Sequence, residues 1–188
     1  NLGRVRDNDA DILLLCAHQK HNIILANQME SQNVNVDAAM GTVGSLNESF
    51  KGEVGGNGDY IYGPTSWDIN ANFDDPVYGG TQDFVWAIEK NSDYTPDYHS
   101  AAGEAVILTF VNAFQSVDEL GPTAVRNAIR DADQFSTVYG QVSFGEKGVI
   151  DKNMLIRQWQ PDAGLRTVYP SAVAQTEPAY PMPAWSER

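Results

Sequence analysis

Short apolar runs alternate with segments of helical period through the first third of the chain. Residues 11–17 and 34–40 contain such runs, which are typical of parallel strands covered on both faces. Residues 20–32 repeat apolar positions with the period of a helix, and 46–54 could form a short helix. Residues 59–62 alternate and are expected to form a third strand. This β-α-β-α-β order predicts a parallel sheet with crossover helices.

The pattern changes at residues 63–76, which are rich in turn formers and poor in periodic apolar positions. We expect the chain to cross between domains here. Three helices are predicted after it, over 81–89, 98–114 and 122–131. The second of these is apolar nearly all round, which predicts that it is deeply buried. The third has proline in its first turn, where a helix accepts it.

The last part of the chain favours antiparallel strands. Residues 138–144 alternate and are followed by a turn at 145–148. Residues 154–160 and 165–169 flank a four-residue turn, which predicts a C-terminal hairpin. Beyond Pro170, repeated prolines predict an extended tail on the surface.

The charge of the chain excludes some partners. Its formal net charge is -13, so the phosphate backbone of a nucleic acid and an anionic membrane surface would both repel it. The acidic residues are spread along the chain, which fits a role in solubility. No apolar run reaches the roughly 18 residues that span a membrane.

Few residues have the spacing of catalytic or metal sites. His18 and His21 lie three residues apart near Glu30, and such a pair on a helix could ligate a metal; the alternative is two polar loop histidines, which we favour because no third ligand is at a diagnostic distance. No nucleophile elbow, phosphate loop or dinucleotide fingerprint is present. We therefore expect no catalytic residue, no metal, no cofactor and no enzymatic activity.

The strongest candidate for a site is positional. Ligands of open α/β sheets lie outside the carboxyl ends of the strands. The first strand ends at 17–19 and the second at 41–44, so His18, Gln19 and Thr42 offer imidazole, amide and hydroxyl groups at neighbouring positions, without a carboxylate. Such groups can hold a small ligand by hydrogen bonds. The alternative is a pair of ordinary polar loops.

A series of short motifs, in order along nearly the whole chain, resembles the branched-chain amino-acid-binding family of solute-binding proteins of ABC importers. The motifs are Gly63–Trp67, Asp75–Gly79, Tyr98–Ala105, Val125–Ala128, Thr137–Gly140 with Val142–Phe144, Gln158–Gln160 and Tyr180–Trp185. Each is weak alone, and the ordered set is specific.

The resemblance implies an α/β fold: the C-terminal half of a two-lobed periplasmic-binding-protein-like fold, with parallel sheets flanked by helices and a C-terminal hairpin. It implies that residues 1–66 complete lobe two, that 67–148 belong to lobe one, and that 149–188 return to lobe two and end in the tail. It also implies a missing N-terminal half, which would supply much of the ligand site, most of lobe one and the export signal.

The family's ligand-contacting loops map to His18, Gln19, Thr42, Val43 and Gly44. Amino-acid-binding members place an acidic residue in the second loop, where Val43 stands here. An amide, a urea-like compound, a carboxylate or an aromatic compound is therefore a better candidate than a plain α-amino acid. The implied function is the periplasmic or extracytoplasmic binding subunit of an ABC importer, with a small-molecule ligand and permease subunits as partners. The alternative is an amide-responsive regulatory domain of the same fold. A flavodoxin-like enzyme domain is disfavoured because the chain has no cofactor loop.

Overall fold

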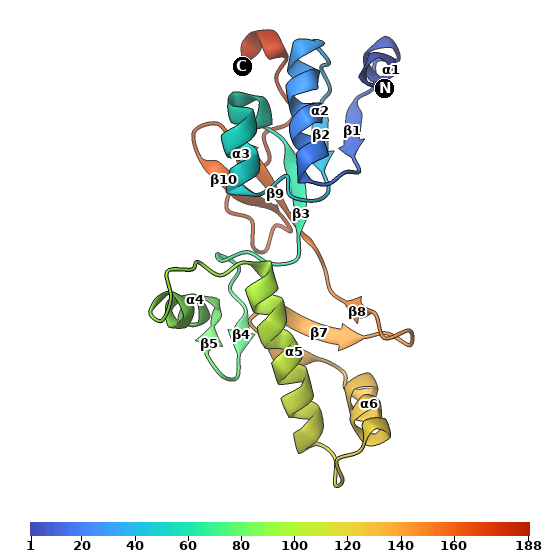
Figure 1. Ribbon diagram of the computed structural model, residues 1–188, viewed down its shortest axis with the longest axis vertical. Coiled ribbons are helices and arrows are strands. Elements are labelled where there is room, and N and C mark those ends of the chain that lie inside the picture. The colour runs from blue at the N-terminus through green and yellow to red at the C-terminus, as the bar shows by residue number, and fades with distance from the viewer. The chain divides into compact units, whose positions relative to one another are not determined.

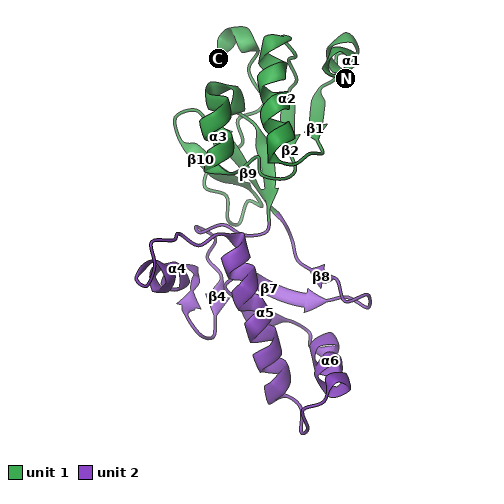
Figure 2. Cartoon of the chain, in the orientation of Figure 1, with its two compact units in different colours: residues 1–65, 155–188 green, residues 66–154 purple.

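The polypeptide passes twice between two units in the computed structural model, which describes residues 1–188 (Figure 2). Unit 1 comprises Asn1–Thr65 and Leu155–Arg188, and unit 2 comprises Ser66–Met154. The second crossing between the units falls after Met154, whereas the family resemblance implies a return to lobe two at residue 149. The reason is local: β8 (Ile150–Asp151) pairs with β7 (Gly140–Phe144) within unit 2.

Unit 1 is a five-stranded sheet in the order β1-β2-β3-β9-β10, with helices packed against it (Figure 1). The first three strands are parallel, and the last two form the antiparallel C-terminal hairpin. The mixed α/β fold with a mainly parallel sheet is thus confirmed. The strands are β1 (Ile12–Leu15), β2 (Ala38–Gly41), β3 (Tyr62–Thr65), β9 (Leu155–Gln160) and β10 (Gly164–Tyr169), and the helices are α1 (Leu2–Asp7), α2 (Gln19–Ser31), α3 (Glu48–Val54), η1 (Gly55–Gly58) and η2 (Trp185–Glu187).

The core of unit 1 lies between its sheet and its helices. Met29 of α2, Phe50 of α3 and Trp159 of β9 are almost fully buried in one apolar cluster. The Trp159 indole N–H also donates to the Ser45 carbonyl at 2.8 Å, which fixes the segment before α3 to the hairpin.

Hydrogen bonds hold the chain beyond Pro170 against unit 1. The fully buried Gln158 side chain donates to the Ala179 carbonyl at 2.9 Å and accepts from the Ala179 N–H at 2.8 Å. The Trp185 indole donates to the Val34 carbonyl at 2.8 Å, and Met182 is buried in the core. The tail is irregular, as the prolines predict, but it does not lie wholly on the surface, because Met182 is buried and hydrogen bonds hold Ala179 and Trp185.

Unit 2 has three longer helices and small antiparallel sheets (Figure 1). Its core gathers around Trp67, whose indole donates to the Val138 carbonyl at 2.8 Å, with Phe84 and Ala101 packed nearby. Its elements are β4 (Asp74–Asp75), β5 (Gly79–Gly80), α4 (Thr81–Glu89), α5 (Tyr98–Gln115), α6 (Pro122–Asp131), β6 (Phe135–Thr137), β7 and β8.

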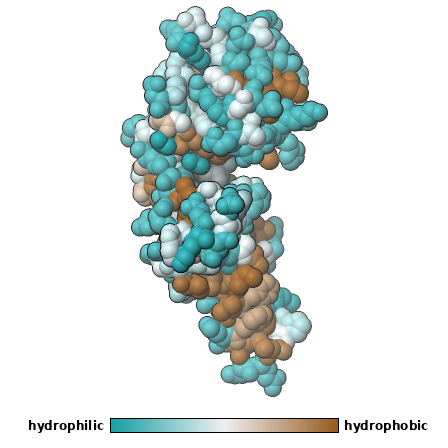
Figure 3. All heavy atoms as spheres, turned by 60° about the vertical axis from the view of Figure 1, so that its left-hand side comes forward, coloured by the Kyte–Doolittle hydropathy of each residue, from teal (hydrophilic) through white to brown (hydrophobic).

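The prediction that α5 is deeply buried is wrong for this chain. One face, which includes Ala101 and Leu108, is buried, but Ile107 is 64% exposed and Phe114 is 48% exposed. Figure 3 shows hydrophobic side chains gathered over the part of unit 2 that contains α5 and α6. Because no element of this chain packs on that face, the apolar composition of the helix overstates its burial here.

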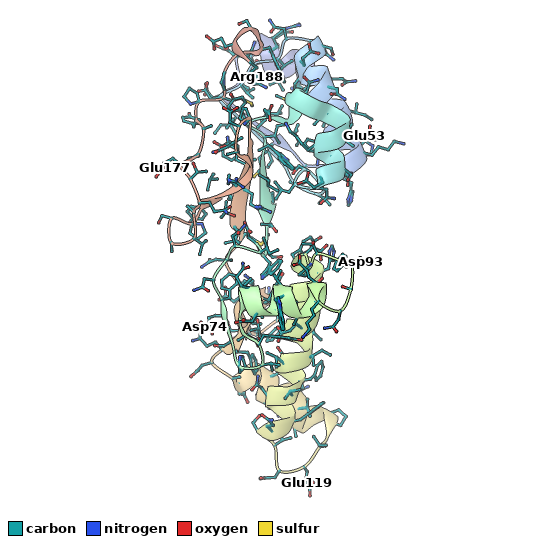
Figure 4. All side chains as sticks on the ribbon, turned by 90° about the vertical axis from the view of Figure 1, so that its left-hand side faces the viewer. Glu53, Asp74, Asp93, Glu119, Glu177 and Arg188 are labelled. Carbon is teal, nitrogen blue, oxygen red and sulfur yellow. The ribbon has the colours of Figure 1, made fainter.

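Apart from buried residues such as Asp68 and Asp75, acidic side chains lie exposed on both units. Figure 4 labels Glu53, Asp74, Asp93, Glu119 and Glu177, all of which are exposed. This distribution fits the solubility role expected of the negative charge. None of the helices combines the length and the apolar character that crossing a membrane requires.

Candidate functional site

The two loops singled out by sequence lie next to each other in unit 1. Because β1 and β2 are parallel neighbours, their carboxyl ends meet at one edge of the sheet. The Thr42 N–H donates to the Leu15 carbonyl at 3.1 Å, and the Val43 N–H donates to the Ala17 carbonyl at 3.2 Å. The backbones of the two loops therefore continue the ladder beyond the last paired strand residues.

The Thr42 side chain bridges the two loops. Its hydroxyl accepts from the Ala17 N–H at 3.0 Å and lies 3.1 Å from the Ala17 carbonyl and 3.2 Å from the Leu15 carbonyl. A hydroxyl has one proton to donate, so it serves one of these carbonyls at a time. Its hydrogen-bonding capacity is thus largely used within the protein.

The Gln19 side chain is also engaged. Its amide N–H donates to the Ser49 hydroxyl at 2.7 Å, and its carbonyl oxygen accepts from the Asn47 amide at 2.9 Å. Gly44 lies against Gln19 with φ +74, and a Cβ on Gly44 would lie 2.5 Å from the Gln19 Cβ. Glycine is therefore required at Gly44 both by its backbone conformation and by this close approach.

The sequence analysis did not single out Asn22, whose side chain forms hydrogen bonds to both loops. This residue of α2 is fully buried, and its amide donates to the Val43 carbonyl at 2.9 Å and to the Ala17 carbonyl at 3.2 Å. Its own carbonyl oxygen is buried without a partner. Position 22 lies on the same helix face as the buried Ala26 and Met29. A polar residue on this apolar face could have indicated from the sequence that Asn22 has a specific role.

His18 and Val43 are the members of the predicted set that remain open to solvent. His18 is the exposed N-cap residue of α2, without a capping hydrogen bond from its side chain, and Val43 is 48% exposed. Neither loop carries a carboxylate from 15 to 19 or from 41 to 47. The arrangement offers an imidazole, an aliphatic surface and backbone groups, which can bind a ligand but lack the acid for a cationic head group.

No group of three histidine, cysteine, aspartate or glutamate side chains is placed to hold a metal ion. His21 lies in the first turn of α2 and is exposed, as is Glu30 near the end of that helix. His18, His21 and Glu30 are close in the sequence but do not form a metal site in the structure.

A βαβ unit whose loops meet at the carboxyl edge of the sheet, in a chain that passes twice between two units, fits the fold of periplasmic-type binding proteins. The chain belongs to the periplasmic binding protein family, whose model matches residues 2–164.

Solved structures share this fold. The leucine-binding protein of Thermotoga maritima superposes with a TM-score of 0.73 at 13% identity, over 88% of this chain and 46% of its own. The branched-chain amino acid binding protein of Streptococcus pneumoniae, in complex with isoleucine, gives 0.63 at 15% identity over 85% and 45%. A solute-binding protein of R. palustris in complex with benzoate gives 0.60 at 17% identity over 92% and 48%. This chain therefore spans about half the length of these relatives.

Proposed function

We propose that this chain is part of the substrate-binding subunit of an ABC importer, which captures a small ligand between two lobes by hinge closure without transforming it. The family match over residues 2–164 carries the proposal. The ligand stabilises the closed form, and the membrane permease recognises that form. The protein would act in the periplasm or another extracytoplasmic space, as its periplasmic relatives do.

The whole protein would include a further N-terminal half. Two observations support this part of the proposal. The solved relatives are about twice as long as this chain, which covers 45–48% of the three described above. In addition, α5, α6 and β7 border an open apolar hollow of about 1290 Å³, lined by side chains such as Phe110, Phe114 and Leu120. We assign this hollow to contact with the N-terminal half, and unit 2 to lobe one and unit 1 to lobe two.

The same loops point to a class of ligand. The α-amino group of an amino acid is a cation, and burying it without a counter-charge is costly. The exposed Val43 and its neighbours on both loops provide no carboxylate. We therefore propose a ligand without an ammonium group, such as an amide, an aromatic carboxylate or a related compound. His18, Gln19, Thr42, Val43 and Gly44 form the unit 1 side of the binding site.

Isothermal calorimetry on the full-length protein tests this ligand class. We expect leucine to bind at least about tenfold more weakly than its neutral or anionic analogues, because one charge-assisted hydrogen bond is worth about 1.5–3 kcal/mol. Val43→Glu should shift this preference towards leucine. Val43→Gln should not, because the glutamine side chain has the size of glutamate but no charge. Tight leucine binding by the unaltered protein would show that the ligand class is wrong.

A ligand-sensing regulator of the same fold is the alternative. Genes for a permease and an ATPase beside the coding sequence favour the importer, whereas a neighbouring amide-degradation operon without them favours the sensor.

A further inference from the structure

The side chain of Asn22 contacts both candidate loops through one amide group. It is fully buried, and its Nδ2 donates to the Val43 carbonyl at 2.9 Å and to the Ala17 carbonyl at 3.2 Å. An amide nitrogen has two protons to donate, so each loop receives one of them. The backbone N–H of Asn22 donates to the His18 carbonyl at 3.1 Å within α2. The residue therefore ties both loops to the first turns of this helix.

The structure around this amide leaves room for it. A Cβ on Gly41 would lie 3.3 Å from the Asn22 Nδ2 and 2.6 Å from the Ser45 Cβ, so β2 ends at a residue without a side chain. The buried Ser45 hydroxyl donates to the Gly41 carbonyl at 2.8 Å. The Val43 carbonyl accepts a hydrogen bond from Asn22 alone. Asn22 therefore fixes the orientation of the peptide between Val43 and Gly44.

This orientation leaves one backbone donor free. The Val43–Gly44 peptide is trans, so the Gly44 N–H points in the direction opposite to the Val43 carbonyl. Because that carbonyl faces the buried Asn22 amide, the Gly44 N–H faces away from it. This N–H donates to no acceptor within the chain, and Gly44 is only half-buried. The Gly44 N–H is thus available to a ligand.

We propose that Asn22 is a positioning residue of the binding site, which holds the Gly44 N–H towards a carboxylate or amide oxygen of the ligand. The inference rests on the proposed function, because it requires that the two loops bind a solute. A free donor on loops without a carboxylate suits an oxygen acceptor and not a cationic group. Asn22 is fully buried, so it acts on the ligand only through the Val43–Gly44 peptide.

Two substitutions in α2 of the full-length protein separate this role from a contribution to stability. Asn22→Leu removes both donors at similar volume. It also removes a carbonyl oxygen that is buried without a partner, so the folded state should survive. Asn27→Leu is the matched control, because the Asn27 carbonyl oxygen accepts from the Asn57 amide at 3.0 Å, a hydrogen bond that does not involve the loops. Thermal unfolding checks that both variants are folded at the temperature of the binding measurements.

Calorimetry with 4-methylpentanoate and 4-methylpentanamide measures the effect on binding. These probes are leucine without its amino group, in an anionic and a neutral form. A hydrogen bond to a charged acceptor is the stronger one, so we expect Asn22→Leu to weaken binding of the acid about tenfold and of the amide about two- to threefold. Asn27→Leu should change neither. Equal losses for the two compounds, or no loss for either, would overturn the inference, since general damage to the site does not distinguish them.

Amide hydrogen exchange followed by NMR tests the geometry directly, without depending on a variant that folds. In the unaltered protein without ligand, the Gly44 amide should exchange rapidly, and bound 4-methylpentanoate should slow it at least about tenfold. A Gly44 amide that is protected before the acid is added, or that is unaffected by the bound acid, would contradict the inference.

A measurement without ligand distinguishes failure of this inference from failure of the proposed function. The Val43 N–H, which donates to the Ala17 carbonyl at 3.2 Å, should exchange several-fold faster in Asn22→Leu than in Asn27→Leu. Equal exchange in the two variants would show that Asn22 does not position the loop. If neither probe binds the unaltered protein, the proposed ligand class is wrong, and the Val43 exchange still decides the role of Asn22.

Discussion

At the scale of the residue, the carboxyl groups of Asp75 and Glu104 differ in the hydrogen bonds that they form within unit 2. Asp75 is buried and accepts hydrogen bonds from the N–H groups of Val77 and Tyr78, both at 2.7 Å, and of Val138 at 3.0 Å. Glu104 of α5 has both carboxyl oxygens buried without a well-formed hydrogen bond. Burial first, and then the charge of Asp75, raise the pKa of Glu104 to about 8.

Glu104→Gln should therefore change how stability depends on pH. The pKa of Glu104 is raised from 4.5 in the folded protein, so its contribution is fully present below about pH 4.5 and is lost as the pH rises through about 8. We expect the Tm of the unaltered protein to fall, relative to Glu104→Gln, between pH 5 and pH 9. Other groups that titrate in this range, including Lys152, are common to both proteins and cancel in the difference.

Differential scanning calorimetry of both proteins across this pH range measures that difference. Glu119→Gln is the matched control, because Glu119 is exposed in the loop between α5 and α6 (Figure 4). Parallel Tm–pH curves for the unaltered protein and Glu104→Gln would show that Glu104 is ionised in the folded state.

At the scale of the element, local sequence signals predicted the bounds of helices, whereas the short strands depend on contacts with distant partners. The bounds predicted for α4 and α6 agree with the structure, because Gly80 and the Gly121–Pro122 pair mark their starts within the sequence itself. The strand predicted at 138–144 is β7, which begins only at Gly140, because Val138 and Tyr139 form the turn from β6, a strand that the sequence analysis did not predict. Strands of two residues such as β4, β5 and β8 have no period to detect, and only their partners define them.

The start of α5 has a complete capping box. The Asp97 carboxylate accepts from the N–H groups of His99 at 2.9 Å and Ser100 at 3.2 Å, and the Ser100 hydroxyl accepts from the Asp97 N–H at 3.4 Å. Burial works against the ionised form of Asp97, but the His99 ring, whose Nδ1 lies 3.2 Å from the Asp97 carboxylate, and these N–H groups together lower the pKa of Asp97. The box satisfies N–H groups that a helix start otherwise leaves without partners.

Asp97→Ala should destabilise the protein by about 0.5–2 kcal/mol, the usual cost of removing an N-cap side chain. Chemical denaturation should show this as a lower midpoint with an unchanged slope. Asp97→Asn, which keeps the accepting oxygen, should retain most of the stability, and Asp93→Ala, in the exposed loop before α5, should have little effect. An Asp97→Ala protein as stable as Asp93→Ala would exclude a capping role.

At the scale of the whole molecule, the sequence predicted the class of fold and the position of the candidate loops but not how each side chain is used. The ends of β1 and β2 follow from apolar runs, and parallel pairing brings them together. The hydrogen bonds that engage Gln19 and Thr42, and the support from Asn22, depend on contacts between residues more than 20 positions apart. The exposure of α5 could not be predicted either. Its apolar composition is typical of a helix covered on all sides, but no part of this chain covers one of its faces.

Mass spectrometry of the full-length protein tests the central claim, that it binds a small solute and releases it unchanged. Protein purified in its native state is denatured, and the released compound is identified and then incubated with fresh protein. We predict one stoichiometric small molecule without an ammonium group, with the same mass before and after incubation. Conversion of that molecule into a product, or the absence of any bound or added solute with measurable affinity, would contradict the account.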